Sequence, residues 1–242
     1  KDKAEVKVVV NGPGSAGIAV SKLLLSYGFK NLTLCNREGI MNENSKDLNW
    51  AQKEMLEVTN LDRKTGTLKD ALVGADIFLG FSGPNMVTAA MVKSMNKDAI
   101  IFACANPTPE IFPDEAKKGG ARVISTGRSD FPNQINNSVC FPGILKGALL
   151  VRAKKISDGM AIRCSHSIAD YSEKKGINPD NIVVTMQDED VFAVEAADVA
   201  MQAIKEGLAR VTMTWDEAYQ RAKKDIEESR SLTKMLMEKD FI

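Results

Sequence analysis

The sequence predicts an α/β fold: an open, doubly wound parallel sheet followed by additional C-terminal helices. Short β-branched runs alternate with segments that are apolar at helical spacing through the first half of the chain. This alternation is typical of parallel strands joined by crossover helices. From about Asn136 onward the pattern becomes helical. We therefore expect two domains, a sheet domain over residues 1–152 and a helical extension, packed on it, over residues 153–242.

Five strands are predicted, each a short apolar run bounded by turn-forming residues, as expected for strands buried on both faces. They are Val6–Asn11, Leu32–Cys35, Ala75–Gly80, Ala99–Ala103 and Arg122–Ser125. Helical segments lie between them at Ile18–Tyr27, Asp47–Val58, Leu68–Val73, Thr88–Met95 and Asp114–Lys118. Four more helices are expected at Asn137–Val151, Asp158–Lys174, Glu189–Lys205 and Trp215–Glu238.

The first predicted strand runs directly into a glycine-rich loop and then into a helix. This G-x-G-x-x-G motif in its strand–helix context is typical of a Rossmann-like dinucleotide site. Gly12 permits the tight turn, Gly14 lets the backbone approach a pyrophosphate, and Gly17 lets helix and strand pack closely. The free N–H groups of the helix start, with Ser15 and Ala16, then face the anion. The alternative is a tight turn that binds nothing.

The tip of the second predicted strand bears on the choice of cofactor. An acidic residue there normally binds the ribose 2′-hydroxyl, but this chain has Asn36 followed by Arg37. A carboxylate would repel a 2′-phosphate, whereas a guanidinium can bind it through two charge-assisted hydrogen bonds. The alternative is that Asn36 bonds the 2′-hydroxyl and Arg37 is a solvated charge. We predict NADP as the cofactor, with NAD as the second choice.

Ligands of such sheets bind beyond the carboxyl ends of the strands. Ser82 and Gly83 follow the third predicted strand, so we expect both to line the cofactor crevice. Asn106 follows the fourth strand, and Asn136 and Asn137 begin a predicted helix. Neutral amides at such positions can bond carboxylates or hydroxyls. The alternatives are a turn amide for Asn106 and a helix N-cap for Asn136.

Composition excludes several classes of function. Lys plus Arg equals Asp plus Glu at 32 each in 242 residues, so no net field favours nucleic acid or an anionic membrane. The longest apolar runs are far shorter than the roughly 20 residues that span a bilayer, and no secretory signal pattern opens the chain. The four cysteines are scattered without a C-x-x-C pair, which indicates a reducing, cytoplasmic setting. Because the chain opens at Lys1 with a strand almost at once, we expect a longer parent protein.

Three segments closely resemble the cofactor-binding domain of the malic enzymes, in the shorter bacterial-type form. They are Val8–Gly17, Phe102–Glu110 and Thr126–Gly143, and Glu189–Arg210 also fits. The resemblance implies oxidative decarboxylation of malate to pyruvate and CO2 with NAD(P) and Mg2+ or Mn2+. Malic enzymes that use NAD often have Asp where this chain has Asn36, which supports NADP.

The resemblance also implies roles for the asparagines. In the family, the asparagine matching Asn106 and one of the pair matching Asn136 and Asn137 hold malate. Adjacent helical residues diverge by about 100°, and we favour Asn137. The family's tyrosine, lysine and acidic metal ligands lie upstream of the glycine-rich loop and match nothing here. We therefore assign no catalytic residue and no metal ligand in this chain, and expect the chain alone to be inactive.

Two other functions stay open on the sequence: a malolactic-type enzyme that converts malate with a retained cofactor, and a standalone nucleotide-binding module without chemistry. By the same resemblance we expect a homodimer or higher homo-oligomer, with the long final helix available for subunit contact.

Overall fold

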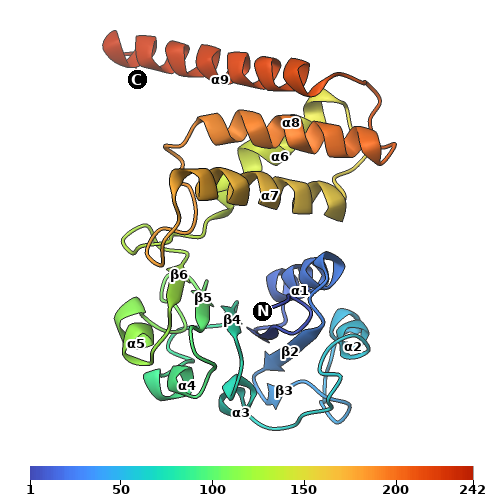
Figure 1. Ribbon diagram of the computed structural model, residues 1–242, viewed down its shortest axis with the longest axis vertical. Coiled ribbons are helices and arrows are strands. Elements are labelled where there is room, and N and C mark those ends of the chain that lie inside the picture. Colours follow the sequence, from blue (N-terminus) through green and yellow to red (C-terminus); the bar gives the residue numbers. More distant parts are fainter. Residues whose placement is uncertain (242) are drawn as a thin grey trace. The chain divides into compact units, whose positions relative to one another are not determined.

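A computed structural model describes residues 1–241, which form two compact units (Figure 1). The sheet unit consists of residues 1–135 and 178–181, and the helical unit consists of residues 136–177 and those from 182 onward. The boundary at residue 135 is earlier than the expected one at residue 152. The reason is that helix α6 (Phe141–Leu150) packs against α8 (Asp190–Lys205) and so belongs to the helical unit.

The sheet has six strands in the order β3-β2-β1-β4-β5-β6. Their bounds are β1 Lys7–Asn11, β2 Asn31–Asn36, β3 Gly39–Ile40, β4 Ile77–Gly80, β5 Ile100–Ala103 and β6 Val123–Thr126. All neighbours are parallel except β3, which pairs antiparallel with β2. The predicted α/β class and its five strands are confirmed. The short edge strand β3 was not predicted, because two residues give no readable periodicity.

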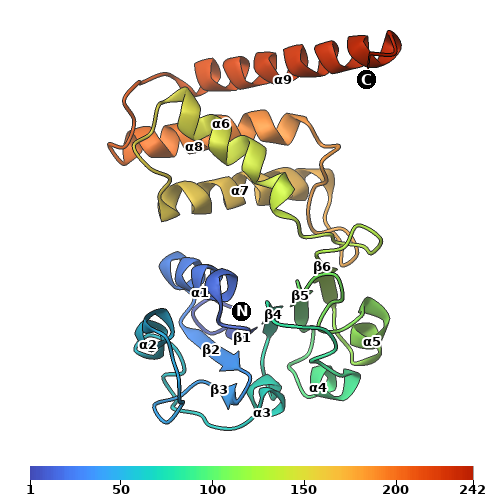
Figure 2. The ribbon, with the colours of Figure 1, turned by 180° about the vertical axis from the view of Figure 1, so that it is seen from behind.

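Helices cover both faces of this sheet (Figure 2). Val8 and Val10 of β1 pack with α1 (Ser15–Tyr27) and α2 (Trp50–Leu56). Val9, which points the other way, packs with α3 (Leu68–Leu72), α4 (Ala89–Lys93) and α5 (Pro113–Lys118). The alternation follows from the two-residue period of a strand. Both faces of β1 are therefore buried, which explains its unbroken run of valines.

The helical unit is built around α8. Figure 1 shows α8 between α7 (Asp158–Lys175) and α9 (Trp215–Glu238), and α6 crosses it on another side. The core face of α8 is rich in alanine, and a Cβ atom at Gly147 of α6 would lie within 3.0 Å of α8 atoms. Small residues at this crossing therefore allow the two helices to pack closely.

The helix predicted over residues 137–151 is two elements in the structure: a 3-10 turn, η1 (Asn137–Val139), and then α6. Pro142 lies in the first turn of α6, where the missing N–H of proline is tolerated. The other three C-terminal helices are present, with ends within one or two residues of those expected.

Candidate cofactor-binding site

The strand register aligns the carboxyl ends of the parallel strands along one edge of the sheet. In the register, Asn11 of β1 pairs with Cys35 of β2 and with Gly80 of β4. Gly80 pairs with Ala103 of β5, and Ala103 pairs with Thr126 of β6. The strand order reverses between β1 and β4, and this switch point is where open α/β sheets bind ligands. The loops after β1 and β4, which carry Gly12–Gly17 and Ser82-Gly83, therefore flank the switch point.

The glycine-rich loop has the geometry that its motif predicts. Gly12 has a positive φ of 95°, and a Cβ atom there would overlap the carbonyl of Phe81. A Cβ atom at Gly17 would lie within 3.0 Å of the Gly12 carbonyl oxygen, so only glycine allows α1 to start this close to the turn. At Gly14 there is open space instead. No side chain caps α1, so its first N–H groups, at the exposed residues Ser15 and Ala16, are left without a side-chain acceptor.

One open cleft of about 830 Å³ contains most of the predicted cofactor residues. Gly12, Gly14, Asn36, Arg37, Ser82 and Gly83 all line it. Pro13 also lines it, and Gln52 of α2 donates from Nε2 to the Pro13 carbonyl over 3.1 Å, which holds the glycine-rich loop. Together with the open space at Gly14, the cleft fits the phosphates of a dinucleotide.

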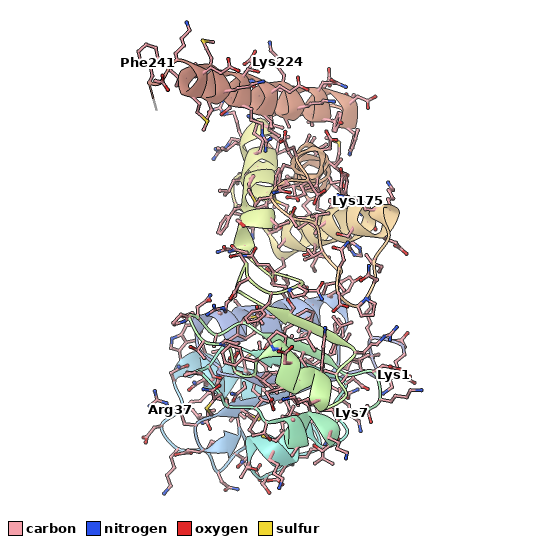
Figure 3. The ribbon with its side chains drawn as sticks, turned by 90° about the vertical axis from the view of Figure 1, so that its left-hand side faces the viewer. Lys1, Lys7, Arg37, Lys175, Lys224 and Phe241 are labelled. Atoms are coloured by element: carbon pink, nitrogen blue, oxygen red, sulfur yellow. The ribbon has the colours of Figure 1, made fainter. Side chains whose placement is uncertain are left out.

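Two cations line this cleft, Arg37 just after β2 and Lys46 in the loop after β3. Figure 3 shows Arg37 at the surface of the sheet unit. Neither Arg37 nor Lys46, which also lines the cleft, forms an ion pair with any carboxylate among residues 1–241. The Oδ1 atom of Asn36 accepts the Glu38 N–H over 2.9 Å, so its amide NH2 is the group left to donate toward a ligand. Glu38 and Asp47 line the same cleft.

A buried carboxylate under the cleft was missed by the sequence analysis. Glu110 is fully buried, and its Oε1 accepts the N–H of Ser82 over 2.9 Å and the Ser82 hydroxyl over 3.2 Å. Its Oε2 accepts the N–H of Ala105 over 3.0 Å. Asn11 in turn donates from Nδ2 to the Ser82 hydroxyl over 2.7 Å. Glu110 thus joins the loops after β4 and β5, and the available signal was only its place in the Phe102–Glu110 segment.

Asn106 lies in the loop after β5, at the same edge of the sheet. Its peptide bond to Pro107 is cis, and its side-chain amide lies against Gly127, at the end of β6. Arg128 donates to the Pro107 carbonyl over 2.9 Å and also pairs with Asp130. Hydrogen bonds from Arg128 hold the pKa of Asp130 below its usual value. The loops after β5 and β6 are therefore tied together, with the exposed Asn106 between them.

Asn136 and Asn137 belong to the helical unit. The Oδ1 atom of Asn136 accepts the N–H of Ser138 over 3.0 Å and caps η1, which is the structural role considered above. Asn137 is the first residue of η1 and is exposed. The side chain of Asn137 is thus the one of the pair not engaged in capping this turn.

Within the part of the chain that the structure describes, no helix is long and apolar enough to cross a membrane. Among residues 1–241 no group of three or more His, Cys, Asp or Glu side chains could hold a metal ion.

The fold, the switch-point cleft and the glycine-rich loop define a dinucleotide-binding domain. Comparison with known proteins gives the particular family: residues 2–205 match the family described as "Malic enzyme, NAD binding domain". The chain belongs to this malic enzyme family.

Individual relatives agree. The chain is 43% identical to the bifunctional malic/malolactic enzyme of Bacillus subtilis, over 93% of this chain and 55% of that protein. It is 39% identical to the NAD-dependent malic enzyme of Geobacillus stearothermophilus, over 87% of this chain and 44% of that one. The crystal structure of Entamoeba histolytica malic enzyme superposes with a TM-score of 0.95 at 45% identity, covering 100% of this chain and 52% of that one.

The chain thus spans about half the length of the curated relatives it matches. Those relatives include both NAD-dependent and NADP-dependent malic enzymes by name, so family membership leaves the cofactor to be argued from the site.

Proposed function

We propose that the chain is the cofactor-binding part of an NADP-dependent malic enzyme, which oxidatively decarboxylates (S)-malate to pyruvate and CO2. The observation that carries the proposal is the cleft at the switch point, lined by Gly12, Gly14 and Arg37, in a chain of the malic enzyme family. The cofactor, when bound, supplies the acceptor for the hydride of malate. The residues of this chain bind and orient it.

Arg37 and Lys46 support the preference for NADP over NAD. Both cations line the cleft without an ion-pair partner among residues 1–241, so neither has to give up a carboxylate to bind a phosphate. Asn36 adds an N–H donor where a carboxylate would repel the same phosphate. Glu38 and Asp47 reduce the local positive charge, so the preference depends on the direct contact made by Arg37.

Asn106 and Asn137 are proposed to hydrogen-bond malate as neutral donors and acceptors, with Asn136 as the second choice of the pair because it caps η1. Residues 1–241 contain no side-chain cluster that fits Mg2+ or Mn2+. By the family resemblance, we propose that the metal ligands and acid–base groups lie outside this chain. It follows that the chain alone is expected to bind NADP but not to turn over malate.

The test is a titration of NADP and NAD into the chain, followed by fluorescence or calorimetry, for three proteins: wild type, Arg37→Ala and Arg122→Ala. Arg122 is the matched control, because it is exposed, has no ion pair among the described residues and precedes β6 at the opposite edge of the sheet. In Arg37→Ala, the loss of a bidentate charged contact worth about 1.5–3 kcal/mol should weaken the binding of NADP by roughly tenfold or more.

Binding of NAD should barely change in Arg37→Ala, and Arg122→Ala should match wild type for both cofactors. Equal losses of affinity for NADP and NAD in Arg37→Ala would mean that Arg37 stabilises the loop rather than binding the 2′-phosphate. Failure of wild type to bind either cofactor would contradict the proposal itself.

A malolactic reaction is the second candidate, favoured by the 43% identity to a relative named as a bifunctional malic/malolactic enzyme. The two reactions differ in product, so malate supplied to the parent protein with cofactor should give pyruvate in the first case and lactate in the second. A standalone nucleotide-binding module would give neither product while still binding NADP.

Oligomerisation and location are part of the same proposal. The second half of α9 exposes Leu232, Met235 and Met237, which suits a homodimer or higher homo-oligomer. Sedimentation of the chain and of Leu232→Lys would test this. All four cysteines are free, which suits the cytoplasm, and cell fractionation would test that location.

A further inference from the structure

The helical unit contains two thiols and a carboxyl group that the proposed function does not use. The Sγ atoms of Cys140 and Cys164 are 3.5 Å apart, and Cys164 Sγ is 3.5 Å from Oε2 of Glu195. These residues come from three elements: Cys140 precedes α6, Cys164 is in α7 and Glu195 is in α8. The cluster therefore sits where three helices meet.

Glu195 lacks the partners that a buried carboxyl group normally has. Its side chain is fully buried, and its Oε1 has no hydrogen-bond partner within the described chain. Burial raises the pKa of Glu195 to about 9 from a usual 4.5, and the neighbouring Cys140 adds to the rise. A Cβ atom at Gly143 of α6 would overlap this carboxyl, so the glycine makes room for it. An unsatisfied buried acid destabilises the fold, so its presence in a native structure needs an explanation.

We propose that Cys140 and Cys164 form a peroxide-reactive dithiol site that closes to a disulfide, with Glu195 as the proton relay. Hydrogen peroxide is the oxidant. The Cys140 thiolate attacks one peroxide oxygen, the O–O bond breaks, and the departing hydroxide takes a solvent proton to leave a sulfenic acid on Cys140. Cys164 sulfur then attacks the Cys140 sulfur, the S–O bond breaks, and the S–S bond forms.

The proton of the second step has a route. The Cys164 thiol gives its proton to Oε2 of Glu195, and the Glu195 carboxyl gives its own to the departing hydroxide, which leaves as water. Overall the two thiols lose two electrons and two protons, and the peroxide is reduced to two waters. The Glu195 carboxyl is unchanged at the end.

The proposed steps need a nucleophilic Cys140 thiolate and a protonated Cys164 thiol, and the two residues differ in exposure and in pKa accordingly. Cys140 is partly exposed and occupies the N-cap of α6, where a helix favours a thiolate. A hydrogen bond from Cys164 lowers the pKa of Cys140, and the same bond raises the pKa of the buried Cys164. Burial raises the pKa of Cys35 and Cys104 to about 12, which disfavours their thiolates.

Closure would also restrain the start of α6. The N–H of Cys140 donates to the carbonyl of Asn137 over 3.1 Å, so a bond to α7 would hold the η1 turn that bears Asn137. If the proposed malate role of Asn137 is right, oxidation would act on that site, and this consequence alone rests on the proposed function.

The experiment treats the reduced chain with one equivalent of hydrogen peroxide, alkylates the remaining thiols and maps peptides by mass spectrometry without reduction. The expected result is a peptide linked through Cys140 and Cys164, reversed by dithiothreitol, with Cys35 and Cys104 alkylated. Cys164→Ala should stop at a sulfenic acid on Cys140 that dimedone traps. Cys104→Ala is the matched control and should give the same linked peptide as wild type.

Glu195→Gln tests the relay separately. It should slow disulfide closure severalfold while leaving the rate of sulfenic acid formation unchanged. The site would be overturned if the protein, shown by circular dichroism to be folded, gave no disulfide-linked peptide. It would also be overturned if the linked peptide contained Cys35 or Cys104 instead. Unchanged closure in Glu195→Gln would overturn the role of Glu195. None of these readouts uses malate or NADP, so failure here and failure of the proposed function are distinguishable.

Discussion

Gly14 and Gly17 offer a matched pair of substitutions to alanine, because the structure assigns opposite consequences to the same added methyl group. At Gly17 the new Cβ would lie within 3.0 Å of the Gly12 carbonyl oxygen, which is backbone and cannot rotate away. At Gly14 nothing lies within 4 Å and φ is −82°, so alanine fits the fold without strain. Gly17→Ala should therefore impair folding, whereas Gly14→Ala should impair cofactor binding.

The magnitudes follow from these contacts. Overpacking costs about 1–3 kcal/mol, and the upper part of that range, about 2–3 kcal/mol, applies at Gly17 because the contact is with rigid backbone. The better helix propensity of alanine returns about 1 kcal/mol. The net loss of roughly 1–2 kcal/mol should lower Tm by roughly 2–8 °C for a chain of this length. Gly14→Ala loses a glycine N-cap, which costs under about 1 kcal/mol. Its methyl group, however, projects where the pyrophosphate is expected to approach, and it should weaken the binding of NADP by about tenfold or more.

The assay is thermal unfolding of each variant without cofactor, followed by NADP titration at a temperature where both variants are folded. Lys69→Ala is a control, since Lys69 is exposed on α3 and does not line the cleft. Normal NADP affinity in Gly14→Ala would refute the argument that the open space at Gly14 receives the phosphates. A normal Tm in Gly17→Ala would refute the argument from close approach of α1.

Three further outcomes are expected. Glu110→Ala leaves the buried N–H of Ala105 and the part-buried N–H of Ser82 without their acceptor, so the free energy of unfolding should fall by about 1–3 kcal/mol for the buried donor alone. The exposed control Glu115→Ala should lower it by less than about 0.5 kcal/mol, and equal effects would contradict the network. The pKa of Glu195 is raised in the folded state, so the unfolded state binds fewer protons between pH 4.5 and about 9. The free energy of unfolding should therefore fall as pH rises through that window, by up to about 1.4 kcal/mol per pH unit. Glu195→Gln should flatten that slope in urea unfolding. Under the proposed function, Asn106→Ala and Asn137→Ala in a full-length malic enzyme that contains this chain should lower kcat/KM for malate by roughly ten- to a thousandfold, with Kd for NADP nearly unchanged. A lower Tm with normal malate kinetics would favour purely structural roles.

Much of this protein could be predicted from local sequence. The valines of β1 and the glycines at 12, 14 and 17 give period-two burial, a tight turn and a close helix start, and all of these depend on residues near one another in the chain. For the same reason the strands and helices were predicted near their observed positions. The residues after each strand could be placed at one edge, because parallel strands all end on the same side.

The tertiary structure alone decided which residues from distant segments meet. The strand order puts Ser82 beside Glu110 across 28 positions, and helix packing puts Cys164 beside Glu195 across 31. The packing of α6 on α8 also set the unit boundary at residue 135. Periodicity and turn propensity act over a few residues and carry no information on such pairs. Contacts between distant segments depend instead on the burial of whole faces, and so they are fixed only once the sheet and the helical unit have formed.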